Sequence, residues 1–283
     1  MKRKRKPLSW LIPPAVAILA LVFIIILSKR PAKTGAKSGS ADVRPSSSAP
    51  GKTDARSVPA APPPRAAIII DDIGYSLEAI ENVYAVGRPL TVSILPYANL
   101  TEESARLAAA CNLEIMLHLP LESNAGKNGT KDVEGTISAG KTDREVRTGV
   151  EKCLARVPNA RGVNNHAGSA TTEEAKLMRP ILEVLKERGL YFIDSRTTSA
   201  SVAREEAAKM GVRAAARQVF IDAEPGEKAI TEKLRELFRL AKKNGRAVGI
   251  CHPKRESLAA LARHAGLADA YGVTLVFASA IVE

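Results

Sequence analysis

Side chains that can bind a metal ion or carry a proton follow short apolar runs of this 283-residue sequence. Asp71 and Asp72 end the run AIIIDDIG, and His118 lies in MLHLPLE. His166 lies in GVNNHAGS, and His252 ends VGICHP before a proline. Neighbouring carboxylates and several imidazoles are costly to bury unless a cation or a reaction balances them. One carboxylate and two imidazoles, with positions left open for water, suit a divalent metal, and zinc is the first choice on ligand type.

These residues need a scaffold that gathers the ends of separate strands. From residue 66 onward, short apolar runs predict strands that alternate with segments of helical spacing. The predicted strands cover residues 66–70, 90–95, 114–119, 162–164, 190–193, 247–251 and 273–278, and 212–221 is a weaker candidate. Such alternation is typical of parallel βα units. The sequence therefore predicts an α/β fold, a distorted β/α barrel of about seven strands that need not close completely.

Turn and cap signals place the helices and one long loop. Capping boxes at 142–145 (TDRE) and 171–174 (TTEE) predict two helix starts. A third helix is predicted over residues 228–243, before Asn244-Gly245. The loop over residues 123–141 is rich in glycine and asparagine. Long loops in compact domains are often functional, so we expect this loop to overhang a site.

The barrel prediction brings the polar strand ends together. In a β/α barrel the carboxyl ends of the strands form one face, and active sites lie there. Three of the four histidines occupy such positions, whereas His264 lies on a helical stretch and is interpreted as a surface residue. Taken alone, Asp71 or Asp72 could cap a helix near Ser76. Three histidines and three carboxylates on one face favour a site over that explanation.

Five motifs in order, IIIDDIG, LHLPLE, GVNNHAGS, FIDSRT and IGICHP, resemble the divergent polysaccharide deacetylase family. That family is a distant branch of the carbohydrate esterase family 4 deacetylases, which share a distorted seven-stranded β/α barrel. The resemblance spans residues 66–283. It implies a metal-dependent hydrolase that removes acetyl groups from N-acetylated envelope or extracellular glycan by metal-activated water.

The resemblance also implies roles for matching residues. Asp71 corresponds to the catalytic base, Asp72 and His118 to metal ligands, and His252 to the general acid. The better-studied branch has His-x-x-x-His where this sequence has His118 followed by Glu122. The third ligand is therefore Glu122, His252 or His166, and we favour His166 because it preserves the charge and softness of the site.

Three further residues are candidates for supporting roles. Asp194 and Arg196, in FIDSRT, fall where the family places residues that orient the base and the acid. They could equally form a plain ion pair that supports a loop. Asn165, beside His166, is the remaining candidate for a supporting side chain or an alternative ligand.

The N-terminal part differs from the rest in composition. Residues 11–27 contain no polar or charged side chain, and five cationic residues precede them. Under the positive-inside rule this predicts an uncleaved anchor within residues 1–28, with a cytoplasmic N-terminus and a domain facing the periplasm or the extracellular side. A cleavable signal peptide is the competing interpretation. Residues 29–65, rich in Pro, Ala and Ser, are predicted to be a disordered linker to the domain at 66–283.

The charge distribution argues against nucleic acid as a partner. Residues 1–65 hold 13 of the 42 Lys and Arg residues and 2 of the 30 Asp and Glu residues. The rest of the chain, with 29 basic and 28 acidic residues, is nearly neutral and has no basic stripe laced with aromatic residues. The expected partners are a glycan and, through the N-terminal segment, a membrane. Two alternatives stay open, another metal-dependent amide or ester hydrolase and a non-catalytic glycan-binding or envelope-scaffold protein.

Overall fold

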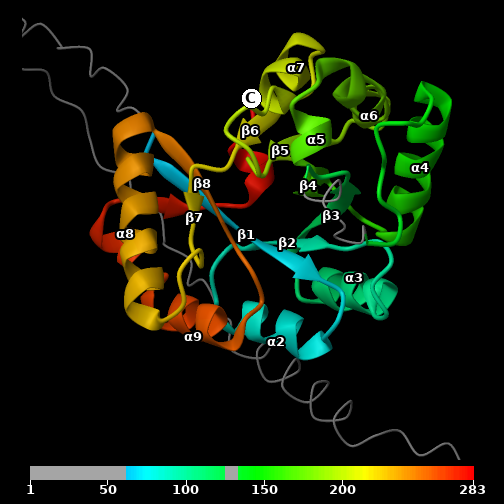
Figure 1. Cartoon of the computed structure of the whole chain (residues 1–283). Helices are drawn as coiled ribbons and strands as arrows, with labels where there is room; N and C mark the ends of the chain where they lie inside the picture. Colours follow the sequence, from blue (N-terminus) through cyan, green and yellow to red (C-terminus); the bar gives the residue numbers. More distant parts are fainter. Residues whose placement is uncertain (1–61, 125–132) are drawn as a thin grey trace, which may run out of the picture. The chain divides into compact units, whose positions relative to one another are not determined.

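Strands alternate with helices along the described part of the chain, residues 62–124 and 133–283 of the computed structural model (Figure 1). The predicted membrane anchor lies outside the described residues, as does the predicted linker except for residues 62–65. Within the two described ranges, no helix combines the length and the hydropathy needed to cross a membrane.

The strands form one sheet in which all hydrogen-bonded neighbours are parallel. The path of the sheet is β6-β5-β4-β3-β2-β1-β8-β7, and β9 pairs with the start of β1. The strands are β1 (Arg65–Ile73), β2 (Thr91–Ile94), β3 (Glu114–Leu121), β4 (Gly162–Ala167), β5 (Tyr191–Asp194), β6 (Ala214–Ala216), β7 (Val219–Phe220), β8 (Arg246–Cys251) and β9 (Thr274–Leu275). Because the strands are parallel, their carboxyl ends meet at one edge of the sheet.

The two ends of the sheet are not joined by a ladder of hydrogen bonds. β6 and β7 belong to one extended segment, which pairs first with β5 and then with β8. Between them, Arg217 N donates to Asp194 O and Gln218 N donates to Val248 O, both at 2.9 Å. We call this place, residues 214–220 between β5 and β8, the seam. The parallel α/β prediction is confirmed. The predicted barrel of about seven strands is a curled half-barrel with eight strands along its path and β9 beside β1, because one short segment pairs with both neighbours in turn.

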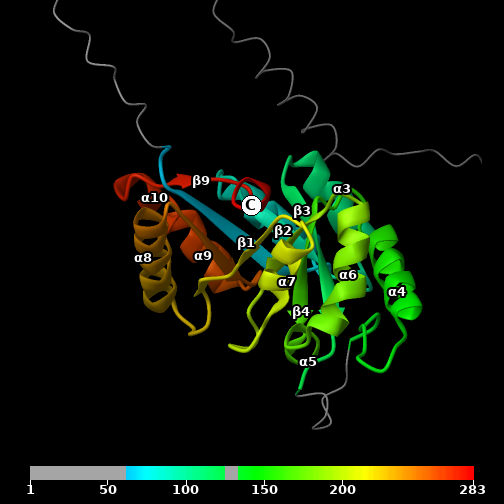
Figure 2. The ribbon, with the colours of Figure 1, turned by 90° about the horizontal axis from the view of Figure 1, so that it is seen from above.

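Helices surround the curled sheet on its outer side (Figures 1 and 2). They are α2 (Leu77–Ala85), α3 (Thr101–Ala110), α4 (Asp143–Arg156), α5 (Ser169–Thr172), α6 (Ala175–Glu187), α7 (Ala203–Lys209), α8 (Glu227–Asn244), α9 (Arg255–His264) and α10 (Leu267–Ala270). The 3₁₀ turn η2 (Ala278–Ala280) lies inside the curl instead. Each of the strands β1 to β8 except β6 is followed by a helix, which returns the chain to the amino-terminal edge of the sheet.

Two of the three predicted helix signals hold. Thr142 Oγ1 accepts from Glu145 N and Glu145 Oε2 accepts from Thr142 N, so the first capping box is formed. Gly245 follows α8 in the left-handed conformation with φ 80°. The second predicted box is wrong, because Thr171 belongs to the short helix α5 and its backbone N–H donates to Glu122 O, and α6 begins only at residue 175.

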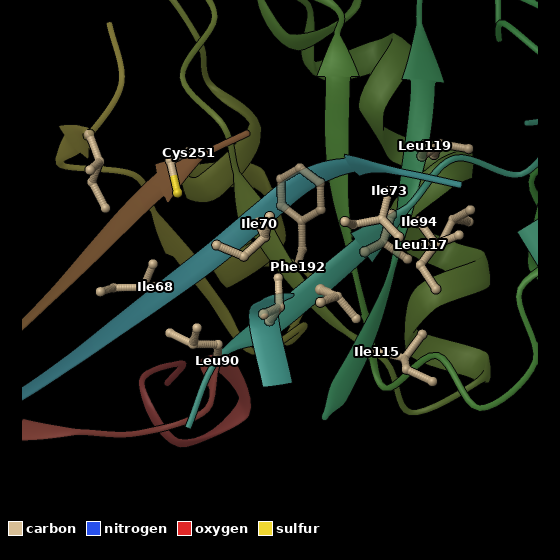
Figure 3. Close-up of a cluster of buried hydrophobic side chains, with 14 of the residues drawn as sticks. Ile68, Ile70, Ile73, Leu90, Ile94, Ile115, Leu117, Leu119, Phe192 and Cys251 are labelled. Atoms are coloured by element: carbon tan, nitrogen blue, oxygen red, sulfur yellow. The ribbon is translucent and has the colours of Figure 1, made fainter. Parts of the chain in front are cut away.

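The apolar core has two parts, divided by the two faces of the sheet. Alternate β1 residues face outward, where Ile68 and Ile70 pack in a cluster under the helices (Figure 3). Ile69 faces the inside of the curl, in a cluster that includes Ala278 and Ile281. The strand predicted at 273–278 is only two residues long, because the chain then turns into η2. This turn places Ala278 and Ile281 inside the curl. The inside of the curled sheet is thus filled by side chains rather than open.

Gly162 is required by a close approach inside this curl. A Cβ at this position would overlap the ring of Tyr191, which is fully buried and held by a 2.8 Å hydrogen bond from its hydroxyl to Glu114 Oε1. We therefore expect Gly162→Ala to lower the free energy of unfolding by about 1–3 kcal/mol, measured by urea titration.

Gly140→Ala is the matched control, because Gly140 is exposed and a Cβ there would meet no atom within 4 Å among the described residues. It should change the free energy of unfolding by less than about 0.5 kcal/mol. Equal effects of the two substitutions would contradict the packing described for Tyr191.

Candidate metal centre

Both aspartates of β1 reach the same site, although neighbouring strand residues normally point to opposite faces. The pairing of β1 with β2 shifts register between Ile70 and Ile73, and Asp72 adopts the left-handed conformation with φ 56°. As a result, Asp72 Oδ1 lies 3.1 Å and Asp71 Oδ2 lies 3.7 Å from His118 Nε2. A non-glycine residue in this conformation costs about 1–3 kcal/mol, and such strain is concentrated at functional sites.

Three donor atoms from three strands converge here. Asp72 Oδ1 of β1 is 3.1 Å from His118 Nε2 of β3 and 3.0 Å from His166 Nδ1 of β4, and the two nitrogens are 3.2 Å apart. Among the described residues, these are the side chains that meet the geometry of a metal-binding group. We call Asp72, His118 and His166 the metal trio.

The geometry of the metal trio fits a metal ion. In a tetrahedral zinc site with bonds of about 2.0–2.1 Å, neighbouring ligand atoms lie about 3.3 Å apart, close to the three separations observed. A face of three such atoms leaves the other side of the ion open, which is the pattern of catalytic zinc sites. The residues present therefore fit a divalent metal.

Asn164 fixes the ring of His118 in the form that binds metal. Asn164 Nδ2 donates to Asp71 Oδ1 at 2.8 Å, which turns Asn164 Oδ1 toward His118 Nδ1, also 2.8 Å away. Ser93 Oγ donates to the same amide oxygen. Since an amide oxygen only accepts, His118 Nδ1 carries a hydrogen, so in the neutral ring Nε2 would be the nitrogen that binds a metal.

The two aspartates differ in their electrostatics. Asp71 is buried, and burial raises its pKa above the usual range despite His118 and the hydrogen bond from Asn164. Burial also raises the pKa of Asp72, but hydrogen bonds from His118 and His166 outweigh it and hold that pKa well below the usual range. Asp72 is therefore suited to hold a cation, and Asp71 to take up and release a proton.

His252 is supported by an aspartate that follows β7. Asp222 Oδ1 lies 3.1 Å from His252 Nδ1, and Asp222 Oδ2 accepts from His252 N at 3.0 Å. Ser257 Oγ donates to the same carboxylate at 3.0 Å. The hydrogen bond to Asp222 raises the pKa of His252, and His252 Nε2 lies 3.7 Å from Asp72 Oδ2. The imidazole is therefore oriented toward the metal trio with a stabilised proton.

The remaining predicted residues lie around the metal trio rather than in it. Glu122 Oε2 accepts from Ala139 N at 2.6 Å, so its carboxylate holds the end of the long loop. Asn165 Oδ1 accepts from Ser195 N at 2.9 Å. Asp194 does not contact Asp71 or His252 by any hydrogen bond of the described residues. It accepts from Ser201 Oγ at 2.7 Å and from the backbone N–H of Arg196 at 2.8 Å.

Asn164 contacts the predicted base, Asp71, and Asp222 contacts the predicted acid, His252. These are the roles that the family resemblance implied for Asp194 and Arg196. The reason is geometric, because Asp194 closes a tight turn onto Arg196, whose φ is 49°. Asp222 had a usable signal, since it follows the apolar run 219–221 as Asp71 follows 67–70. Asn164 lies within a strand, and only the register of β4 places it opposite His118.

The site opens into a cleft of about 400 Å³. Its walls include both aspartates, the three strand-end histidines and side chains of the seam. They are Asp71, Asp72, His118, Asn165, His166, Ala167, Ser195, Arg196, Thr197, Arg217, Phe220, Ile250 and His252. Residues 125–132 of the long loop lie outside the described residues, so the predicted overhang stays a prediction.

Comparisons with known proteins identify the family of the chain. The family model described as divergent polysaccharide deacetylase matches residues 68–282. The chain belongs to this family. The family resemblance predicted from the five motifs is thereby confirmed.

Relatives within reach of sequence comparison are similar over most of the domain. A Haemophilus influenzae protein is 32% identical over 195 residues, which are 69% of this chain and 69% of that protein. The Escherichia coli protein YibQ is 31% identical over 188 residues, which are 66% of this chain and 58% of its own length. Both are described as uncharacterized. A crystal structure of an Agrobacterium tumefaciens protein, also uncharacterized, has a TM-score of 0.73 at 27% identity and covers 79% of this chain and 91% of that one.

The support of His252 by Asp222 can be tested by titration. In Asp222→Asn the imidazolium loses its carboxylate acceptor, so we expect the pKa of His252 to fall and its protonated fraction near neutral pH to decrease. The measurement is an NMR titration of the His252 ring in metal-free protein. Asp194→Asn is the control and should leave this pKa unchanged, and a fall in Asp194→Asn alone would contradict the assignment.

Proposed function

We propose that this protein is a metal-dependent deacetylase that removes acetyl groups from N-acetylated glycan. The observation that carries the proposal is the convergence of three donor atoms within 3.2 Å of one another, beside a buried carboxylate and an aspartate-supported histidine. Membership of the divergent polysaccharide deacetylase family supports a carbohydrate substrate. We propose zinc as the metal, since one carboxylate and two imidazoles suit it.

Asp72, His118 and His166 would hold the ion. A divalent metal bound there supplies Lewis acidity, which lowers the pKa of a water molecule and polarises a carbonyl oxygen. Asp71 is placed to take the proton of the attacking water. Its Oδ1 is held by Asn164, and burial raises its pKa, which makes its carboxylate a stronger base.

His252 is placed to return a proton. Cleavage of an acetamide requires protonation of the departing amine nitrogen, and a neutral imidazole could not supply this proton. Asp222 stabilises the imidazolium through Nδ1 and leaves Nε2 directed at the cleft. The base and the acid are thus separate residues. Asp72, whose pKa is held low, would serve as a metal ligand.

Metal content and turnover should respond differently to substitutions. We expect Asp72→Ala, His118→Ala and His166→Ala to weaken zinc binding by about 100-fold or more, measured by competition with a chelating dye. Asp71→Asn should keep its zinc and lose acetate release from chitooligosaccharides and peptidoglycan by about 10²–10⁴-fold. Glu122→Gln should keep its zinc, because Glu122 holds the loop instead.

Two outcomes would overturn parts of the proposal. Zinc lost in Glu122→Gln and kept in His166→Ala would contradict the metal trio. Stoichiometric zinc without acetate release from any N-acetylated glycan would contradict the enzymatic role and favour a glycan-binding protein.

We also propose that residues 1–28 anchor the domain in the cytoplasmic membrane and that the domain faces outward. The apolar run at 11–27 and the basic residues before it support this. The full chain should stay with membranes after alkaline carbonate extraction, whereas a chain beginning at residue 66 should be released. Protease added to spheroplasts should degrade the domain. A mature N-terminus found after residue 28 would show instead that the segment is cleaved.

A further inference from the structure

Two guanidinium groups line the cleft without a carboxylate partner. Arg196 and Arg217 both face it, and neither forms an ion pair within the described ranges. Arg217 Nε donates to Ser195 O at 2.6 Å and its second terminal nitrogen donates to Arg196 O at 2.8 Å. The same guanidinium lies over the ring of Phe220, 5.1 Å from its centre. Arg217 is therefore held in a fixed plane by neutral partners, with one terminal nitrogen left to bind something else.

The charges of the cleft do not balance with a metal in place. A divalent ion would offset Asp71 and Asp72, the two acidic residues of the cleft wall. Asp194 lies behind the wall, is buried, and already accepts from Ser201 and from the Arg196 backbone. Asp194 interacts with the charges of both Arg196 and Arg217 and offsets part of them. With a divalent ion balancing Asp71 and Asp72, the wall would keep a positive excess, which favours an anion.

A buried hydroxyl points to the same place. Ser195 is 5% exposed and lines the cleft, yet its Oγ has no hydrogen-bond partner among the described residues. Buried hydroxyls are nearly always satisfied, so the Ser195 hydroxyl is available to a group bound at this wall. Its neighbours along the wall are Arg196 and the Arg217 side chain, which already holds the Ser195 carbonyl.

The basic wall continues along the seam. A second hollow of about 590 Å³ shares Arg196 and Arg217 with the cleft and adds Arg204 and Arg246. Arg246 pairs with Glu283 and Arg204 lies 3.7 Å from Glu205, so these two are partly balanced. The seam thus carries four arginines on two adjoining hollows, of which the second lies beyond Arg196 and Arg217.

We propose that Arg196, Arg217 and Ser195 bind an oxyanion carried by the glycan, so that the substrate is an acidic N-acetylated polymer whose chain extends along the seam. This assignment deepens the proposed function and rests on it. A carboxylate fits best, because the free terminal nitrogen of Arg217 and the guanidinium of Arg196 can each donate to one of its two oxygens. A phosphate offers the same chemistry and is separated by the experiment.

The test is calorimetric binding to the full chain, zinc-loaded and carrying Asp71→Asn so that ligands are not consumed. The first pair of probes is a hyaluronate tetrasaccharide and its carboxyl-reduced form, and the second is N-acetylglucosamine 1-phosphate and N-acetylglucosamine. We expect the acidic tetrasaccharide to bind about tenfold or more tightly than its reduced form, less so at high salt. Arg196→Gln and Ser195→Ala should reduce this difference, and Arg196→Lys should restore part of it.

Arg106→Gln is the matched control, since it removes an exposed arginine on α3 far along the chain from the seam. A preference seen only in the phosphate pair would support the subsite with phosphate as the oxyanion. Equal binding of charged and neutral probes, or a preference that survives Arg196→Gln and Ser195→Ala, would overturn the inference. Binding is measured without turnover, so the two proposals can fail separately. If the acidic probes bind more tightly but the wild-type protein releases no acetate from any glycan, the proposed function is refuted and the oxyanion subsite is still supported.

Discussion

The carboxamide of Asn164 ties together the groups on which the site depends. It bonds Asp71 through nitrogen and His118 and Ser93 through oxygen, so one buried side chain links β1, β2, β3 and β4 at one level. Since the amide can be satisfied in only one orientation, the position of the base and the tautomer of His118 are set together. A buried polar network of this kind is stable only when every member is hydrogen-bonded. The site therefore depends on β1, β2, β3 and β4 lying side by side in the sheet.

The open sheet provides the other half of the site. In a closed barrel, the whole segment 214–220 would pair with a strand on each side. Here its first part pairs only with β5 and its last part only with β8. Arg217 lies at that change, and Asp222 follows directly after β7 to hold His252. Three residues of the cleft wall, Asp72, Ala167 and Arg196, lie near strand ends and have strained backbones with φ near 50°. The packed faces of the sheet hold these turns in place.

The sequence predicted the parallel sheet and the residues at its carboxyl edge because both follow from local patterns. Apolar runs mark the strands. Asp71, Asp72, His118 and His166 lie in the carboxyl-terminal halves of their strands, and His252 directly follows β8. The patterns could not show the bulge at Asp72, since register depends on the neighbouring strand. They could not show that the segment 214–220 splits its pairing, or that Asn164 and not Asp194 contacts the base, because both depend on cross-strand geometry. Arg217 interrupts the apolar run and weakened the strand signal at the seam, and the structure places it on the cleft wall.

The central claim is that one carboxylate and two imidazoles from three strands hold a metal beside a separate base. It is tested most directly by anomalous diffraction at the zinc absorption edge from crystals of the zinc-loaded protein. The account predicts one peak within the cleft, about 2.0–2.1 Å from Asp72 Oδ1, His118 Nε2 and His166 Nδ1, with Asp71 not bound to it. A peak bound by Glu122 in place of His166, or no peak in the cleft, would contradict it.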